Sequence, residues 1–274
     1  MLDAQGGCAY YETGNYNYVK FDVNDSAVAP DGYLMRTNFG TKGNHKLDQG
    51  VERYQAITDF MADACNAGKL EHDYLIKHIS RYLKHGITKL DMYDFMPESE
   101  EDEHYFPFHD YITRYSSASV ILVQGVKPNE SPLNTVSWTI IGWPLTTVAI
   151  PLTLATAKLP ALVTDDGTGH SRLNEMGLQL KSRIFTLKRG NNTKFYGNLA
   201  PLFNKKGTGI LQRILPIEEE VMRRGEKALD DLRKTKSHTY YSHSECRRIG
   251  QIRLYHQWFH AKWQVLLRSS HQPR

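Results

Sequence analysis

The chain has 274 residues, of which 40% are hydrophobic and 23% charged, so it has the composition of a globular protein with enough length to bury a core. Its net charge of +4 is small, and its three cysteines lie far apart with no Cys-x-x-Cys pair. These values exclude a disordered chain, a disulfide framework and a cysteine-built zinc site.

The first forty residues have the pattern of short strands. Residues 9–12 and 16–23 are expected to form two strands around a turn at 13–15, and a turn at 30–32 precedes a third strand over 33–38. No signal-peptide pattern is present, and Met1 leads almost directly into β-structure. We therefore expect a chain cut from a larger one.

Two helices are predicted next, over 51–67 and 70–85, because apolar residues recur there at helical spacing. The face of the first helix that we expect to be buried consists of Val51, Tyr54, Ile57, Met61 and Cys65. The following run, 91–110, holds eight acidic residues and no Lys or Arg, which predicts a solvated surface excursion.

Strands return after this acidic run. Residues 119–126 form a nearly continuous apolar run, typical of a strand covered on both faces, and further strands are expected within 136–150. Residues 131–157 carry no charge, but three prolines and six threonines interrupt them, whereas a spanning helix needs about 20 mostly apolar residues. The segment is therefore interpreted as buried strands, with no membrane span.

The C-terminal part is predicted to be helical. One helix follows a cap at Ser171, and Pro216 is expected to open another whose first turn is acidic and whose end, at Arg233 and Lys234, is basic. A last helix is expected over 249–266. Residues 221–274 contain twelve Lys or Arg and four acids, but no nucleic-acid motif, so a solvated basic face is favoured over a nucleic-acid partner. The whole pattern predicts an α+β layered domain.

Several familiar chemistries have no motif in this sequence. Gly-x-Ser-x-Gly, a phosphate-binding glycine loop and His-Glu-x-x-His are all missing. His256 and His260 are four residues apart, as in some metal sites, but no third ligand is near, so packed or solvated histidines are the favoured interpretation.

Two polar residues are better candidates. Asn38 ends a predicted strand at a loop, where its amide N–H could meet a developing oxyanion, or where it could simply satisfy its own turn. Arg114 precedes the apolar run 119–126, and a partly buried Arg requires an anionic partner. That partner could be a thiolate, a substrate carboxylate or a structural Asp.

Read together with their neighbours, these segments resemble the choloylglycine hydrolase and isopenicillin-N acyltransferase-like proteins, and in particular the Bacteroides-type members. The likeness runs from about residue 3 to about residue 235. It is carried by Asp3-Ala4-Gln5-Gly6-Gly7, Ala9-Tyr10-Tyr11-Glu12, Phe21-Asp22-Val23-Asn24-Asp25, Gly32-Tyr33-Leu34-Met35-Arg36-Thr37-Asn38-Phe39, Gly50-Val51-Glu52-Arg53-Tyr54, Ile79-Ser80-Arg81-Tyr82-Leu83-Lys84-His85-Gly86, Arg114-Tyr115-Ser116-Ser117-Ala118-Ser119 and Trp143-Pro144-Leu145-Thr146-Thr147-Val148.

The resemblance implies an enzyme of the N-terminal-nucleophile hydrolase superfamily, which cleaves or transfers acyl groups at linear amide bonds. Its four-layer αββα fold has two stacked antiparallel sheets between helices, with the helices over 51–67 and 70–85 on one outer face. Asn38 corresponds to the oxyanion-hole asparagine, and Arg114 to the arginine beside the nucleophile. The resemblance implies no cofactor and no metal, and it leaves the acyl amide substrate and the substrate-binding residues open.

The nucleophile of that family is a cysteine with a free α-amine, and it lies well upstream of the segment that begins this chain. Cys8 lies inside a predicted strand and is bonded to Gly7, so without cleavage it has no α-amine; Cys65 and Cys246 have less claim. We therefore expect no nucleophile in this chain, an incomplete fold, and no activity without the N-terminal segment of the same enzyme. The alternative is a non-catalytic truncated or binding protein that keeps only the scaffold.

The expected organisation is a partial domain over 1–235 and a basic helical extension over 236–274 packed on it. Unpaired strand edges in such a partial domain would favour a homo-oligomer. The resemblance suggests a periplasmic or secreted protein, while the sequence itself leaves the compartment unknown.

Overall fold

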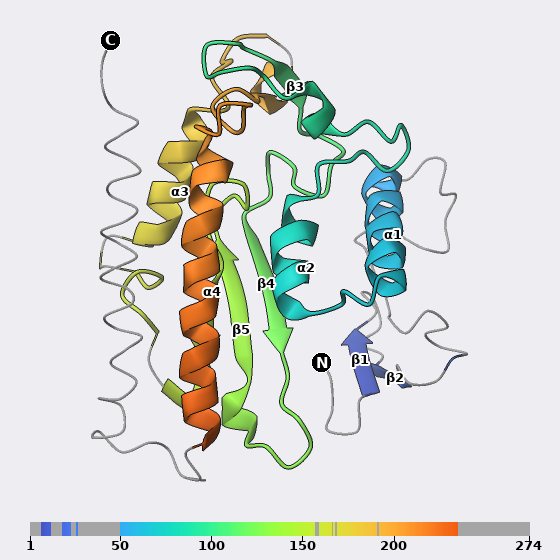
Figure 1. The fold of residues 1–274 in the computed structure, drawn as a ribbon, viewed down its shortest axis with the longest axis vertical. Coiled ribbons are helices and arrows are strands. Elements are labelled where there is room, and N and C mark those ends of the chain that lie inside the picture. Colours follow the sequence, from blue (N-terminus) through green and yellow to red (C-terminus); the bar gives the residue numbers. More distant parts are fainter. Residues whose placement is uncertain are drawn as a thin grey trace.

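A computed structural model describes residues 7–11, 18–22, 26, 50–156, 159–165, 167, 169–190 and 192–234. Over these residues the chain is a mixture of helices and antiparallel strands, which confirms the α+β class (Figure 1). The predicted strand over 33–38, the predicted last helix and the proposed extension over 236–274 lie outside the described residues.

The main sheet has three antiparallel strands in the order β4 (Ser119–Gln124), β5 (Val136–Ile141) and β6 (Ile150–Thr153). In the described part of the uncharged segment, β5 confirms the strand expected at its start, whereas residues 142–149 are a buried turn and the second strand, β6, begins only at Ile150. None of the described helices is both long enough and apolar enough to cross a membrane.

Two smaller antiparallel sheets accompany it. Strands β1 (Gly7–Tyr11) and β2 (Tyr18–Asp22) form a pair in which Cys8 is opposite Phe21. The sequence predicted two strands here, over 9–12 and 16–23. Strands β3 (Tyr105–Pro107) and β7 (Tyr196–Asn198) form the other. The stacking of two sheets between helices stays a prediction.

Four α-helices are present in the described residues. They are α1 (Val51–Asn66), α2 (His72–His78), α3 (Arg172–Ser182) and α4 (Ile210–Lys234). Short 3-10 turns cover Ile79–Arg81, Met92–Phe95, Pro132–Asn134, Leu154–Thr156 and Thr193–Phe195. The predicted helix over 51–67 and the helix after Ser171 are confirmed, whereas the helix over 70–85 stops earlier and its last turn is 3-10.

The predicted buried face of α1 was wrong. The buried residues are Ala56, Phe60 and Ala64, while Cys65 is half-buried. Helix α1 packs closely on the segment around Gly86, because Gly86 lies directly against the backbone of Glu52 and Ala56. Small residues and one Phe therefore form its buried face. The larger apolar residues that dominate the sequence pattern flank this narrow contact.

The predicted start of the last described helix was also wrong. Helix α4 begins at Ile210 and holds Pro216 in its interior, so the acidic residues after Pro216 are not in its first turn. One of them, Glu218, is fully buried. The basic end at Arg233 and Lys234 is confirmed.

Strand β4 was expected to be covered on both faces, and this was wrong. Val120 and Leu122 pack into the core, but Ile121 and Val123, on the opposite face, are 64% and 60% exposed.

The acidic run over 91–110 differs in part from its prediction as a surface excursion. Its acids are exposed or half-buried as predicted, but Met92 and Phe108 within it are fully buried, because the run crosses the core between its surface loops.

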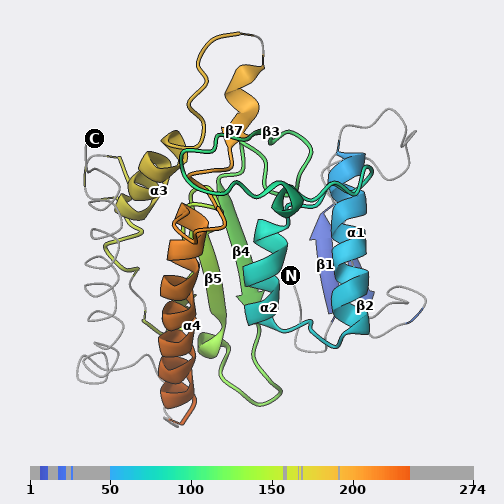
Figure 2. The ribbon, with the colours of Figure 1, turned by 45° about the horizontal axis from the view of Figure 1, so that its top comes forward.

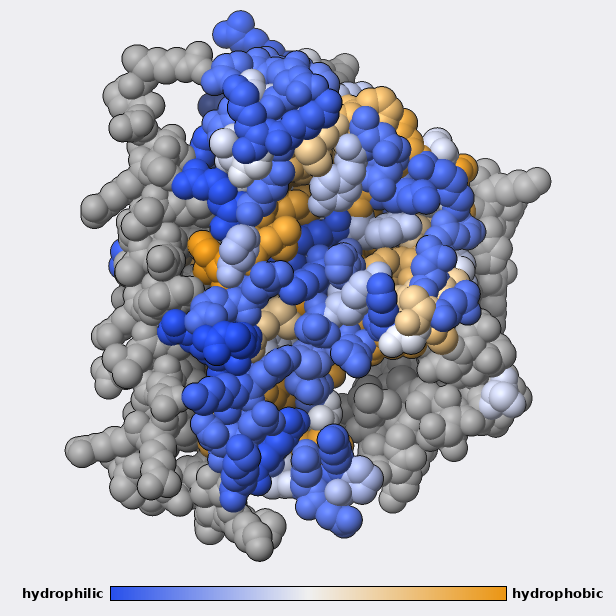
Figure 3. Space-filling view, in the orientation of Figure 1, coloured by the Kyte–Doolittle hydropathy of each residue, from blue (hydrophilic) through white to orange (hydrophobic). Residues whose placement is uncertain are grey.

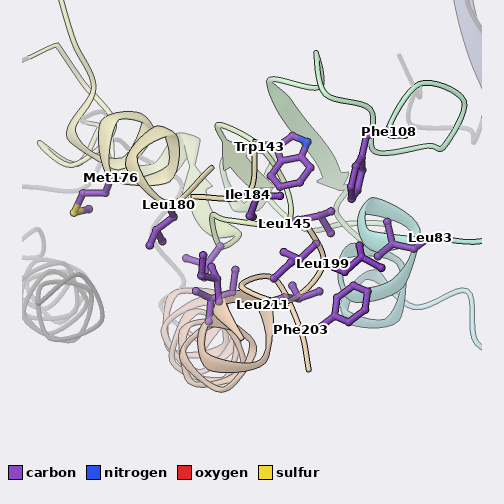
Figure 4. Packing of buried hydrophobic residues seen from close by; sticks show 14 of the residues in the cluster. Leu83, Phe108, Trp143, Leu145, Met176, Leu180, Ile184, Leu199, Phe203 and Leu211 are labelled. Carbon is purple, nitrogen blue, oxygen red and sulfur yellow. The ribbon is translucent and has the colours of Figure 1, made fainter. Parts of the chain in front are cut away.

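Helices α2 and α4 cover one face of the main sheet, and the views in Figures 1 and 2 agree on this arrangement. Ile76 of α2 and Met222 of α4 pack with Trp138 of β5. Gly225 allows the close approach of α4, because a side chain there would lie 3.0 Å from the Trp138 ring. A second cluster joins α3, α4 and the surrounding loops; Figure 4 shows its members Phe108, Trp143 and Leu145.

Candidate functional site

The loop between β3 and β4 carries Arg114, and its backbone is held on both sides. The Ser117 hydroxyl accepts a hydrogen bond from the Arg114 N–H at 3.0 Å. The indole N–H of Trp143 donates to the Arg114 carbonyl at 2.8 Å, and the Ser117 N–H donates to the same carbonyl at 3.0 Å. Because Trp143 is buried in the core, it fixes the position from which the Arg114 side chain projects.

The neighbouring Tyr115 is held as firmly. Its N–H donates to the Phe108 carbonyl at 3.0 Å, and its carbonyl accepts from the Lys181 ammonium at 2.5 Å. The same ammonium lies 4.2 Å from the centroid of the Tyr115 ring, a cation–π contact. Burial lowers the pKa of Lys181 from its ordinary value.

A second anchor lies on the other side of Arg114. The Thr113 hydroxyl, which is buried, donates a short hydrogen bond to the Ser80 carbonyl. The next residue, Arg81, forms a two-pronged ion pair with Glu218 at 2.8 and 2.7 Å, and both side chains are almost completely buried. The loop that carries Arg114 is therefore tied to the turn after α2 and, through it, to α4.

Arg114 lines a cavity of about 400 Å³ that opens to the surface. Its walls come from the first turn of α1, from the loop between β3 and β4, and from the 3-10 turn before β7. The lining residues are Glu52, Arg53, Phe108, His109, Asp110, Arg114, Tyr115, Ser116 and Phe195. The volume falls within the range of small-molecule sites in proteins.

A second guanidinium, that of Arg53, lies in the same cavity. It folds back over Gly50, where any side chain would overlap the Arg53 guanidinium. Gly50 also has a φ of 108°, in the left-handed region that favours glycine. Gly50 thus starts α1 and at the same time leaves the room in which Arg53 lies.

The two arginines act on each other electrostatically. Burial is the main cause that lowers the pKa of Arg53, and the positive charge of Arg114 is the next. The negative charges of Asp110 and Glu52 act in the opposite direction and more weakly. The ion pairs found between described residues include neither Arg53 nor Arg114.

Of the two predicted site residues, Arg114 and Asn38, the structure describes only Arg114. Arg114 lines a cavity, and within the described part of the chain it forms no ion pair, so all three expected partners, a thiolate, a substrate carboxylate and a structural Asp, stay open. Asn38 lies outside the described residues, as do Cys246, His256 and His260. Sequence reasoning missed Arg53, although the Gly50-Val51-Glu52-Arg53 segment was recognised; a glycine at a helix start three residues before an Arg was the available signal.

The cavity offers fixed positive charge, aromatic walls, a hydroxyl at Ser116 and an imidazole at His109. In the part of the chain that the structure describes, no group of three or more His, Cys, Asp or Glu side chains is placed to hold a metal ion. No protein-family model, curated protein or solved structure matches the chain. The chemistry of this cavity, together with the sequence motifs, is therefore the basis for any functional assignment.

Proposed function

We propose that the chain supplies the scaffold and substrate pocket of a cysteine N-terminal-nucleophile enzyme, which cleaves or transfers acyl groups at linear amide bonds. The observation that carries this proposal is the position of Arg114. The residue that the resemblance assigns beside the nucleophile lies on a firmly held loop and lines a cavity of about 400 Å³.

In the proposed mechanism a thiolate attacks the carbonyl carbon of an acyl amide, and negative charge develops on the carbonyl oxygen. Asn38 would donate its amide N–H to that oxygen, a contribution of roughly 2.7–4 kcal/mol to the transition state. The positive charge of Arg114 would favour the thiolate form of a nearby cysteine or hold a substrate carboxylate.

The proposal places residues 1–235 in part of a four-layer αββα domain and residues 236–274 in an extension packed on it. The three antiparallel sheets and the helices α2 and α4 on one face of the main sheet are compatible with part of such an arrangement. The nucleophile is proposed to be a cysteine outside Cys8, Cys65 and Cys246, none of which has a free α-amine in this sequence.

The test is amine release from a panel of acyl amides. The protein is produced from its natural gene, with everything encoded in frame, and its N-terminus is mapped by mass spectrometry. We expect turnover of at least one amide and a loss of about a hundred- to a thousandfold in Asn38→Ala. Arg114→Met should lower turnover as well, whereas Arg189→Met, a matched change at an exposed arginine, should not. A folded protein that releases no amine from any amide would favour the non-catalytic alternative.

A further inference from the structure

We propose that Arg53 and Arg114 together bind the carboxylate of a small aromatic acid in the cavity between α1 and the loop before β4. The inference rests on the proposed function for the location of the site and deepens it, because it names the chemical class of ligand. It starts from one observation: two guanidinium groups from segments about sixty residues apart line one cavity.

The charges of this cavity are arranged so that an anion would stabilise it. Arg53 is partly removed from water, and it lies close enough to Arg114 for the positive charge of Arg114 to lower the pKa of Arg53. Neither guanidinium is in an ion pair with a described residue, whereas Arg81, the most buried arginine of this region, has a two-pronged partner. A carboxylate between Arg53 and Arg114 would relieve their repulsion and accept charge-assisted hydrogen bonds from both.

The acidic residues of the cavity limit which anion can bind. Glu52 and Asp110 bring the formal charge of the four ionised lining residues to zero, so a ligand with two or more negative charges would meet repulsion as well as attraction. A single carboxylate gains the contacts with the arginines and meets less repulsion from Glu52 and Asp110. This argument favours a carboxylic acid over inorganic phosphate.

The side chains that line the cavity indicate the chemistry of the part of the ligand attached to the carboxylate. Tyr115 and Phe195 are in edge-to-face contact, with ring centroids 5.6 Å apart, and the ring of His109 lies 3.9 Å from that of Phe195. With Phe108 they form the aromatic part of the cavity's lining. Flat rings stack favourably on such surfaces, so an aromatic body attached to the carboxylate fits the lining better than a hydrophilic one.

The backbone that carries the two arginines is fixed before a ligand binds. Trp143 and Ser117 fix the backbone of Arg114, and Gly50 leaves the room for Arg53. A fixed backbone lowers the cost of ordering on binding, which raises the affinity for a ligand of matching charge.

The test is calorimetric titration of the full chain with benzoate, with its neutral analogue benzamide, and with inorganic phosphate. Saturable binding of benzoate is expected, at least tenfold tighter than binding of benzamide or phosphate. Arg53→Met and Arg114→Met should each weaken benzoate binding at least tenfold, while Arg189→Met, with an exposed arginine replaced, should leave it unchanged. Arg53→Lys should restore only part of the affinity, since lysine keeps the charge but loses the planar fork.

Thermal unfolding of each variant shows whether it is folded, so a lost site and a lost fold are told apart. Equal affinity for benzoate and benzamide would overturn the carboxylate assignment, and tighter binding of phosphate would overturn the aromatic acid. Unchanged benzoate binding in folded Arg53→Met would overturn the paired site. The titration needs no catalysis, so benzoate binding without amine release would contradict the proposed function and leave this inference standing.

Discussion

At the scale of single residues, the ion pair between Arg81 and Glu218 connects three parts of the molecule. Arg81 also donates to the carbonyls of Ile76 and Thr147, each at 3.2 Å, and Glu218 accepts from the Ala149 N–H at 2.6 Å. The turn after α2, the turn between β5 and β6, and helix α4 are therefore joined by two charged side chains with almost no exposure to water.

Removing one partner of this pair should be strongly destabilising. Glu218→Gln would leave the Arg81 guanidinium buried without its counter-charge, at an expected loss of about 3–5 kcal/mol in the free energy of unfolding. Urea denaturation measures it. Glu219→Gln is the matched control: its partner Lys77 is at 3.0 Å but both side chains are solvated, so the loss should stay below about 1 kcal/mol. Equal losses for the two variants would contradict the buried pair.

Tyr111 should make stability depend on pH in the alkaline range. Burial, assisted by the charges of Asp91 and Asp110, raises the pKa of Tyr111 to about 12 from its ordinary value of about 10. Above pH 10 the unfolded chain therefore loses this proton before the folded chain does. The free energy of unfolding should fall there by at most about 1.4 kcal/mol per pH unit from this group.

Denaturation at several pH values between 9 and 12 tests this, with Tyr111→Phe as the comparison. The variant keeps the ring and loses the titrating hydroxyl, so its stability should fall less steeply above pH 10. Parallel curves for the two proteins would mean that Tyr111 does not contribute.

At the scale of elements, Gly86 sets the position of α1. A side chain at Gly86 would overlap the carbonyl of Glu52 and lie 2.5 Å from the Ala56 nitrogen, so α1 would have to move. Gly86→Ala is expected to cost about 1–3 kcal/mol of stability by overpacking. Gly125→Ala, where a side chain meets open space, is the control. Because Arg53 is in the first turn of α1, the shift should also weaken benzoate binding; unchanged stability and binding would refute the close contact.

The elements that sequence reasoning predicted well are those with a strong local pattern. The periodic run over 51–67 gave α1 to within one residue, and Val136–Ile141 is the strand β5. The errors arose where packing overrides the local signal. Pro216 can lie inside α4 because helix residues on both sides bury apolar side chains, and Glu218 can be buried because Arg81 meets it. Neither compensation is readable from neighbours in sequence.

Strand β4 is a second example in which the local sequence pattern does not determine burial. A continuous apolar run cannot say whether both faces are covered, and here Ile121 and Val123 are mostly exposed. Among the described strands, β4 pairs with β5 alone, so it is an edge of the part of the main sheet that the structure describes. An apolar edge strand is a site at which proteins associate.

At the scale of the whole molecule, this edge predicts self-association. The described face seen in Figure 3 is mostly hydrophilic, with smaller hydrophobic patches. Ile121 and Val123 of β4 are both more than half exposed, so they are the side chains to be tested. We expect the chain to form dimers or larger species at micromolar concentration, and Ile121→Lys to shift it toward the monomer. Light scattering after size exclusion measures this.

Ile87→Lys provides the control for that experiment. Ile87 is 55% exposed but lies in a turn over residues 86–88 and not in a strand, so its replacement should leave the distribution of species unchanged. A wild-type chain that is monomeric at all concentrations would contradict the prediction, as would an equal effect of the two variants.

The candidate site was only partly predictable. Arg114 was proposed because an Arg before an apolar run needs an anionic partner, and it lines the cavity. Arg53 has only the weak local signal of Gly50, and it reaches the cavity through the packing of α1 on Gly86. The buried supports of the site, Trp143 and Lys181, are also far from Arg114 in sequence. The residue types of a site are readable from sequence, but the partners that hold them depend on the fold.

The central claim is that Asn38 and Arg114 serve one reacting centre, and their separation tests it most directly. Each must lie about 3 Å from reacting atoms, so the two side chains should be within about 12 Å of each other. Cross-linking of the Asn38→Cys, Arg114→Cys double variant with a short bismaleimide, in a background where Cys8, Cys65 and Cys246 are replaced by Ser, measures this. We predict an efficient intramolecular cross-link between residues 38 and 114, found by mass spectrometry of the digested monomer. A folded variant in which both thiols react singly and never together would contradict the account.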